Sequence, residues 1–173
     1  RNVRVEGGDV SVDVELGYPA ASQIAPMRRA VIEALKGAGA ANVSANVTMK
    51  IVAHAVQRGL KVMPNVKNII AVASGKGGVG KSTVAANLAL ALAAEGARVG
   101  VLDADIYGPS IPKLLAIRGR PETIGGTKLR PMDGYGMPVM SMGFLVEEET
   151  PMIWRGPMVM SALTQMLREV EWG

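Results

Sequence analysis

Residues 74–83 read Ser74-Gly75-Lys76-Gly77-Gly78-Val79-Gly80-Lys81-Ser82-Thr83. They match the phosphate-binding pattern G-x-x-x-x-G-K-[ST] at Gly75, Gly80, Lys81 and Ser82. Glycines let backbone N–H groups approach phosphate oxygens without a Cβ in the way. The lysine brings a positive charge to the β- and γ-phosphates, and the serine hydroxyl can ligate Mg²⁺. The stretch therefore predicts a site for a nucleotide bound with Mg²⁺.

The segments that flank this loop are the ones that the pattern requires. An apolar run at 69–73 predicts a parallel strand buried on both faces. The stretch from Lys81 to Glu95 predicts a helix that stops at Gly96. A second apolar run at 99–102 completes a strand–helix–strand crossover. A glycine-rich turn can match the pattern by accident, but this context favours a true phosphate-binding loop.

Two carboxylates, Asp103 and Asp105, follow the second predicted strand directly. Ligands of open α/β sheets sit at the carboxyl ends of the strands, so we expect both aspartates beside the loop. One can hold a water on Mg²⁺, and the other can position the water that attacks the γ-phosphate. The alternative is that one aspartate only caps the turn before Ile111. The preceding phosphate-binding loop favours the catalytic interpretation.

The N-terminal part of the chain predicts a small domain of its own. Apolar residues alternate with polar ones at 3–5 and again at 10–16, on either side of a Gly-Gly turn, which predicts a β-hairpin with one buried face. A helix is expected from an N-cap at Ser22 to a stop at Gly37. A third alternating run at 43–51 predicts one more strand.

We therefore expect an α/β protein in three parts. A small α+β (ββαβ) domain covers residues 1–52, a linker covers 53–66, and a P-loop NTPase domain with a parallel sheet covers 67–173. The linker contains the only histidine, His54, which is more simply a solvated residue than a metal ligand. Arg1 lies in a predicted strand and the chain stops just after a predicted helix. We expect the first domain to be truncated at its N-terminus and the second at its C-terminus.

Downstream of the aspartates the pattern predicts a short helix, a polar loop, two strands and a closing helix, at 114–117, 118–126, 128–132, 138–142 and 157–170. The run Glu147–Glu149 is more simply a solvated loop than a metal site.

Composition limits the classes of function. Hydrophobic residues make up 49% of the chain but aromatic residues only 3%, so we expect an aliphatic, Met-rich core. The net charge is +4, but the basic residues are scattered, so nucleic-acid binding is not indicated. No apolar stretch is long enough to span a bilayer, so we expect no membrane partner. The chain has no cysteine, which excludes disulfides and cysteine-based metal sites within it.

Three stretches resemble a known family. Lys76, directly after the first glycine of the loop, resembles the extra lysine of the deviant Walker group of P-loop ATPases, which includes nitrogenase iron protein and the partitioning and septum-site ATPases. Residues 101–112 and 151–158 are similar to the Mrp/ApbC subfamily of iron–sulfur cluster carrier proteins. Residues 1–66 resemble the small PaaD-like domain often fused ahead of the ATPase in bacterial members.

This resemblance implies a cytoplasmic homodimer that binds and hydrolyses ATP, holds a [4Fe–4S] cluster between its subunits and transfers the cluster to apo-proteins. It implies that ATP is held by Gly75, Lys76, Gly77, Gly78, Val79, Gly80, Lys81, Ser82 and Thr83. Lys76 would reach the nucleotide of the partner subunit. Asp103 would serve Mg²⁺ through water, beside Ser82, and Asp105 would serve the attacking water.

In the family, a C-x-x-C pair in the later part of the ATPase domain holds the cluster, and an acidic Walker B segment follows close to where this chain stops. Neither is present here, so the resemblance implies no cluster ligand within these 173 residues. We therefore expect cluster binding and hydrolysis to be properties of the parent protein.

A positional switch of the partitioning or septum-site type is the alternative from a different class, since its ATP-dependent dimer binds DNA or membrane. It shares Lys76, Lys81 and the aspartate pair. It does not explain the N-terminal domain or the stretch 107–112, and no basic amphipathic helix supports it. A reductase like nitrogenase iron protein would also need cluster cysteines. A C-x-x-C pair in the C-terminal sequence favours the carrier, whereas a terminal basic amphipathic helix favours the switch.

Overall fold

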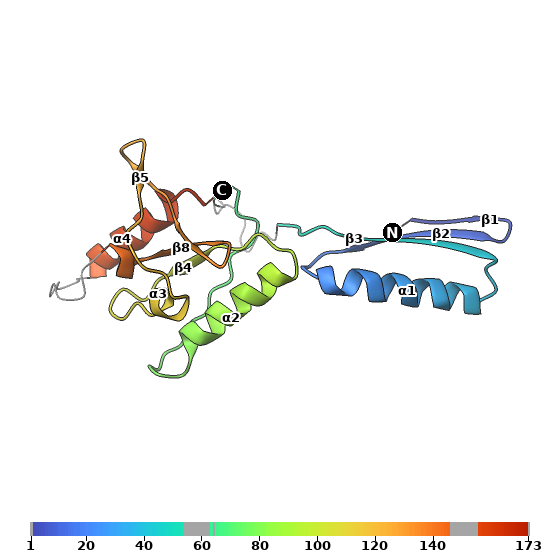
Figure 1. Cartoon of the computed structure of the whole chain (residues 1–173), viewed down its shortest axis with the longest axis horizontal. Coiled ribbons are helices and arrows are strands. Elements are labelled where there is room, and N and C mark those ends of the chain that lie inside the picture. The colour runs from blue at the N-terminus through green and yellow to red at the C-terminus, as the bar shows by residue number, and fades with distance from the viewer. Residues whose placement is uncertain (1, 54–62, 64, 146–155, 173) are drawn as a thin grey trace. The chain divides into compact units, whose positions relative to one another are not determined.

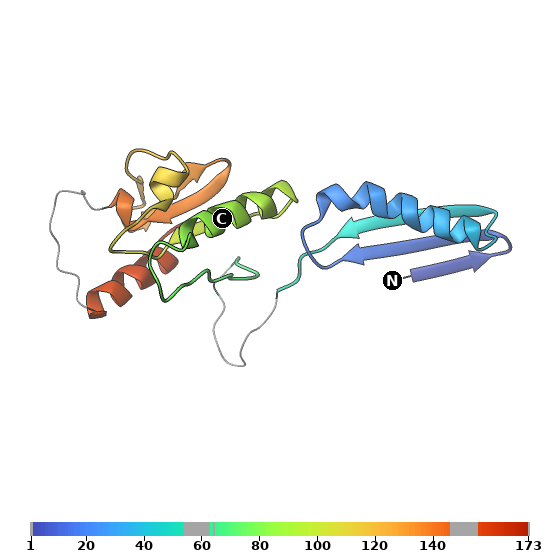
Figure 2. The ribbon, with the colours of Figure 1, turned by 90° about the horizontal axis from the view of Figure 1, so that it is seen from below.

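The structure is a computed structural model, and it describes residues 2–53, 63, 65–145 and 156–172. The chain divides into two units (Figures 1 and 2). The N-terminal unit is Arg1–Arg58 with Ala94–Ala97, and the P-loop unit is Gly59–Ala93 with Arg98–Gly173.

The N-terminal unit contains a three-stranded sheet and one helix. Its elements are, in order, β1 (Asn2–Glu6), β2 (Asp9–Leu16), α1 (Ala21–Gly37) and β3 (Asn42–Met49). The sheet order is β1-β2-β3, in which β1 is antiparallel and β3 parallel to β2. Gly7, in the turn between β1 and β2, has a φ of +61°, which glycine adopts without strain.

The core of this unit lies between the sheet and α1. Leu16, Ala20 and Val47 are buried, and half-buried apolar residues of β2 and α1 pack around them. Val3 and Val5, predicted on a buried face, are 66% and 64% exposed. Their strand β1 is at the edge of the sheet, whereas α1 packs chiefly against β3. The helix therefore leaves the edge valines uncovered.

The prediction of Ser22 as the N-cap of α1 is wrong. The helix begins at Ala21, and the N-cap residue Ala20 makes no side-chain cap. Ser22 lies inside the first turn, where its N–H and its hydroxyl donate to the carboxylate of Glu95, in the same unit, at 3.0 and 2.7 Å. These two hydrogen bonds, chiefly the one from the hydroxyl of Ser22, hold the pKa of Glu95 below its ordinary value.

The P-loop unit contains the remaining elements. They are α2 (Lys81–Ala94, whose last residue belongs to the N-terminal unit), β4 (Val101–Asp103), α3 (Ile111–Leu114), β5 (Thr123–Ile124), β6 (Lys128–Leu129), β7 (Met132–Gly134), β8 (Met137–Ser141), the 3₁₀ helix η1 (Met142–Phe144) and α4 (Gly156–Arg168). The main sheet has the order β4-β8-β7, and β5 pairs with β6 separately. The unit is thus mixed α/β with small sheets.

Strand β8 is the centre of the core of the P-loop unit. Its residues Met137, Val139, Met140 and Ser141 are 0–1% exposed. Alanines and methionines of the helices, together with apolar loop residues, complete the buried cluster. Phe144 is the one aromatic residue among the buried members of that cluster in the described part of the chain. The core is therefore aliphatic and rich in methionine, as the composition predicts.

The predicted strand at 69–73 is absent from the structure. Residues 66–74 carry no regular secondary structure, and Ile69 and Ile70 are 66% and 61% exposed. A strand needs a neighbour to accept its hydrogen bonds, and among the described residues no strand pairs with this segment. The predicted crossover therefore lacks its first strand.

The predicted parallel sheet of the P-loop unit also needs correction. In the described main sheet of this unit, β4 and β8 are parallel, whereas β7 is antiparallel to β8. The predicted strand at 128–132 is divided in two, because Lys128–Leu129 pairs with Thr123–Ile124 and β7 begins only at Met132. Pro131 stands at the interruption and has no N–H for a ladder. The predicted polar loop at 118–126 thus contains a short strand.

Other predicted boundaries move by a few residues. The second strand covers Val101–Asp103, the short helix covers Ile111–Leu114, and the closing helix ends at Arg168. The predictions for His54 and Glu147–Glu149 lie outside the described residues. In the described part of the chain, no helix has both the length and the apolar character needed to cross a membrane.

Candidate functional site

The glycine-rich loop leads directly into α2, which begins at Lys81. The N–H of Val84 donates to the carbonyl of Gly80 at 2.9 Å and closes the first helical turn. Gly78 and Gly80 have φ values of +75° and +87°, in the left-handed region, where any residue with a side chain would have a strained backbone. The first turn of a helix presents N–H groups with a partial positive charge, which favours an anion at this end.

The space around the glycines is open. A Cβ built at Gly75, Gly77, Gly78 or Gly80 would meet no atom within 4 Å. Contacts with the rest of the protein therefore do not explain why these positions are glycine. A bound phosphate does explain it, because a side chain here would keep the phosphate oxygens away from the backbone N–H groups. The loop thus fits a bound phosphate.

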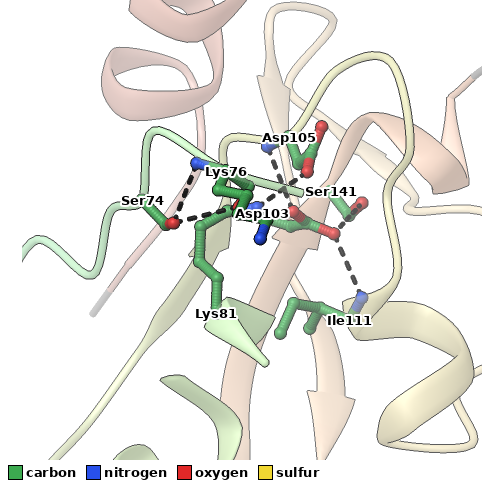
Figure 3. A network of polar contacts seen from close by, with 7 residues as sticks. All are labelled: Ser74, Lys76, Lys81, Asp103, Asp105, Ile111 and Ser141. Carbon is green, nitrogen blue, oxygen red and sulfur yellow. Dashed lines mark hydrogen bonds and ion pairs between the residues drawn. The ribbon is translucent and has the colours of Figure 1, made fainter. Parts of the chain in front are cut away.

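Ser74 holds the start of the loop and was missed by the sequence reasoning. Its hydroxyl accepts a hydrogen bond from the N–H of Lys76 at 3.1 Å and donates to the carbonyl of the same residue at 3.0 Å (Figure 3). A serine that closes a two-residue turn is a common local motif, so its position before Gly75 was a usable indication. Lys76 itself is exposed.

Two predicted residues from different elements meet at this site. The Nζ of Lys81, the first residue of α2, lies 3.0 Å from Oδ2 of Asp105, two residues after β4. The two side chains are 34% and 36% exposed. An ion pair this exposed contributes up to about 1 kcal/mol to stability. The pair is therefore weak enough for an anionic ligand to displace the carboxylate from Lys81.

Asp103 is buried, with 5% exposure, and both of its oxygens are engaged (Figure 3). Oδ1 accepts a hydrogen bond from the N–H of Asp105 at 3.2 Å. Oδ2 accepts from the N–H of Ile111 at 3.1 Å and from the hydroxyl of Ser141 at 3.2 Å. A buried carboxylate is costly without such partners. These bonds support the alternative that Asp103 caps the turn before Ile111, and Ser141 is a partner that the sequence reasoning missed.

The side-chain atoms near the loop that could bind a metal ion are oxygens, which are the ligands that Mg²⁺ prefers. Ser82 is the second residue of α2 and is half-buried. Asp103 is the last residue of β4, and Asp105 follows two residues later. The described residues contain no group of three or more His, Cys, Asp or Glu side chains that could hold a metal. Mg²⁺ usually takes one or two protein ligands together with phosphate oxygens and waters.

The remaining loop residues lie at the surface. Val79 is 55% exposed, and Thr83 is exposed in the first turn of α2 with its carbonyl accepting a hydrogen bond from the side chain of Asn87 at 2.8 Å. Of the predicted site residues, the structure brings Lys81, Asp103 and Asp105 together beside the loop, through the ion pair of Lys81 with Asp105 and the hydrogen bond between the two aspartates.

Family comparison places both parts of the chain. Residues 65–173 match the family described as NUBPL iron-transfer P-loop NTPase. Residues 1–49 match the family described as iron-sulfur cluster assembly protein.

Individual relatives agree with these matches. An iron-sulfur cluster carrier protein of Pseudomonas fragi is 51% identical over 148 residues, which cover 84% of this chain and 51% of the relative. The iron-sulfur cluster carrier protein of Bacillus subtilis (strain 168) is 44% identical over 179 residues, which cover 99% of this chain and 51% of the relative. The iron-sulfur cluster transfer protein NUBPL of Mus musculus is 57% identical over 123 residues, which cover 68% and 39%.

The chain spans about half or less of the length of these relatives. The P-loop NTPase match alone extends over more than half of the 173 residues and contains the whole glycine-rich loop with both aspartates. The chain therefore belongs to the family of NUBPL iron-transfer P-loop NTPases.

Proposed function

We propose that this chain is the ATP-binding and ATP-hydrolysing part of an iron–sulfur cluster carrier, a homodimer in the cytoplasm that transfers [4Fe–4S] clusters to apo-proteins. The observation that carries the proposal is the contact of 3.0 Å between Lys81 and Asp105 beside an open glycine-rich loop. The relatives that are named as cluster carriers support the choice of cargo. The positional switch is not favoured by any of these observations.

ATP is held by the loop from Gly75 to Thr83. The N–H groups of the loop and of the first turn of α2 surround the phosphates, and Lys81 exchanges Asp105 for the phosphate oxygens. The hydroxyl of Ser82 would hold Mg²⁺. The support for this arrangement is the open space at the glycines and the oxygen donors near the start of α2.

Hydrolysis requires a positioned water and charge stabilisation. Asp105 places the water, because its carboxylate is partly exposed and paired only weakly. Asp103 is the predicted outer ligand of Mg²⁺ through water, and its three hydrogen bonds also give it a positioning task. Lys76, exposed at the loop, reaches the nucleotide of the partner subunit and stabilises charge there.

The cluster itself is cargo that these residues do not hold. Iron–sulfur clusters are held mostly by cysteine thiolates, and the chain has none. The cluster ligands are therefore assigned to sequence outside these 173 residues. The relatives, of which this chain spans about half or less, are long enough to supply such sequence.

We propose the same domain organisation that the sequence predicts. A PaaD-like domain of ββαβ order covers residues 1–52, a linker covers 53–66, and the ATPase domain covers 67–173. The family matches at 1–49 and 65–173 support these boundaries.

Calorimetric titration with Mg·ATP and Mg·ADP tests the nucleotide site. Lys81→Ala removes a charge-assisted contact to phosphate and is expected to weaken binding roughly ten- to a hundredfold. Lys128→Ala is the matched control, since it removes the same charge from the exposed strand β6 and should bind as the wild type does. Equal binding by the wild type and Lys81→Ala would remove Lys81 from the site. A full-length protein that binds no nucleotide would contradict the proposal as a whole.

A further inference from the structure

Ser141 is the last residue of β8 and is fully buried, with 0% exposure. Its neighbours in the strand, Val139 and Met140, are apolar and equally buried. A hydroxyl in such surroundings costs free energy unless it forms hydrogen bonds. The partners of this hydroxyl therefore explain why the core accommodates a polar residue here.

Ser141 makes two hydrogen bonds with different consequences. Its Oγ accepts from the N–H of Gly143 at 3.1 Å and so caps η1. The same hydroxyl donates to Oδ2 of Asp103 at 3.2 Å (Figure 3). The parallel register of β4 and β8 places Asp103 directly opposite Ser141. Capping of η1 accounts for the accepted bond but not for the donated bond.

Asp103 transmits this constraint to the loop that carries Asp105. The carboxylate accepts from the N–H groups of Asp105 and Ile111, one at each end of that loop. The terminal torsion of an aspartate is broad, so hydrogen bonds decide how its oxygens are oriented. The hydroxyl of Ser141 is the one side-chain donor to this carboxylate among the hydrogen bonds of the described residues, and it fixes the orientation from the opposite strand.

We propose that Ser141 is a positioning residue for ATP hydrolysis: it holds the Asp103 carboxylate, which in turn holds the loop that presents Asp105 beside Lys81. This inference rests on the proposed function, because it needs Asp105 to place the attacking water. Ser141 touches no phosphate in this arrangement. Its loss therefore lowers kcat and leaves the affinity for ATP unchanged.

The first measurement compares hydrolysis with binding in the full-length protein. Ser141→Ala is expected to lower kcat roughly ten- to a hundredfold, since a buried hydrogen bond is lost from the support of the catalytic loop. The Kd for Mg·ATP and the number of binding sites should stay at the wild-type values. Ser141→Thr keeps the hydroxyl and should restore hydrolysis. Ser161→Ala, at an exposed position of α4, is the matched control.

A second measurement needs no nucleotide. Amide hydrogen exchange at Asp105 and Ile111 should become roughly ten- to a hundredfold faster in Ser141→Ala and should not change in Ser161→Ala. Combining Ser141→Ala with Asp103→Asn should cost little more hydrolysis than Asp103→Asn alone, because both changes act through one carboxylate.

Several results would overturn the inference. The first is unchanged hydrolysis in Ser141→Ala, and the second is unchanged hydrogen exchange at both amides. The third is a number of binding sites that falls in parallel with kcat, because that result would mean that Ser141 only supports the core. A wild type that neither binds nor hydrolyses ATP would overturn the proposed function and the hydrolytic role of Asp105 with it. That failure is recognisable because exchange at Asp105 and Ile111 would still respond to Ser141→Ala.

Discussion

Asp103 and Asp105 stand two residues apart, yet their carboxylates have different surroundings. Asp103 is 5% exposed and accepts three hydrogen bonds, so it cannot move without breaking them. The side chain of Asp105 is 36% exposed, and its carboxylate is held by the ion pair with Lys81. A fixed carboxylate suits the support of a loop, whereas a partly exposed one can follow a water molecule. The two residues are therefore suited to different tasks.

At this scale we predict that Lys76→Ala and Asp105→Ala in the full-length protein retain nucleotide binding and lose hydrolysis. Loss of a group that positions the water or stabilises the transition state lowers such rates by roughly 10²–10⁴-fold. Steady-state ATPase rates and calorimetric Kd values are the measurements. Asp133→Ala is the matched control, because the carboxylate of this residue accepts a hydrogen bond from the N–H of Gly136 in the β7–β8 turn.

The proposed role of Lys76 at the nucleotide of the partner subunit has its own test. In mixed dimers, one subunit carrying Lys76→Ala should impair hydrolysis at the site of the wild-type partner. Rates measured across a series of mixing ratios would then fall below the sum of independent sites. Rates that follow that sum would mean that Lys76 acts only on its own nucleotide.

At the scale of elements, the glycine-rich loop and α2 form one anion-binding unit. Gly80 is the residue whose carbonyl receives the first helical hydrogen bond, and its φ of +87° turns the chain into the helix. The space that its missing side chain leaves is empty of protein atoms. A side chain at this position therefore has two separate effects. It strains the backbone, which lowers the stability of the fold, and it occupies the space of the phosphate, which weakens ligand binding.

We predict that Gly80→Ala lowers the free energy of unfolding by about 1–2 kcal/mol and weakens ATP binding much more than that strain alone would. The control is Gly126→Ala, because Gly126 has a φ of +80° and an equally open environment in the β5–β6 turn. Thermal unfolding should shift alike in the two variants, while calorimetry should show lost ATP binding only for Gly80→Ala. Equal binding by both would argue against phosphate in the loop.

At the scale of the whole molecule, the chain contains the chemistry for a nucleotide and lacks the chemistry for a cluster. Phosphate and Mg²⁺ require N–H groups, a lysine and oxygen ligands, and these gather around α2 and β4. A cluster requires thiolates, and the sequence contains none. We therefore propose that nucleotide binding and cluster binding depend on different regions of the sequence.

This separation predicts the outcome of anaerobic reconstitution with iron and sulfide. The 173-residue chain should remain without charge-transfer absorbance in the visible, since it offers no cysteine thiolate for the iron. The full-length protein should gain that absorbance. A stable cluster on the 173-residue chain would show that the ligands have been assigned wrongly. A colourless full-length protein without a C-x-x-C pair would instead favour the partitioning-type switch.

Local patterns predicted the elements whose hydrogen bonds are local. The helix after the loop was predicted to begin at Lys81, and α2 does so. The alternating run at 10–16 corresponds to β2. The apolar run at 69–73 was mispredicted as a buried strand, because a strand depends on a neighbour that its own residues do not specify. Ser22 was mispredicted as a cap because Glu95, 73 residues away, accepts its hydrogen bonds.

The sequence by itself determined the chemistry of the loop, since glycines, Lys81 and Ser82 at that spacing specify a phosphate site wherever the chain folds into a loop and a helix. It also determined the absence of thiolates. Only the tertiary structure decided which aspartate is held and which is partly exposed. The deciding contacts join Asp103 to Ser141, 38 residues away, and Lys81 to Asp105, 24 residues away. The first contact arises because the parallel strands β4 and β8 align their carboxyl ends, and the second because the start of α2 lies beside the segment that follows β4. No local pattern of residues encodes either alignment.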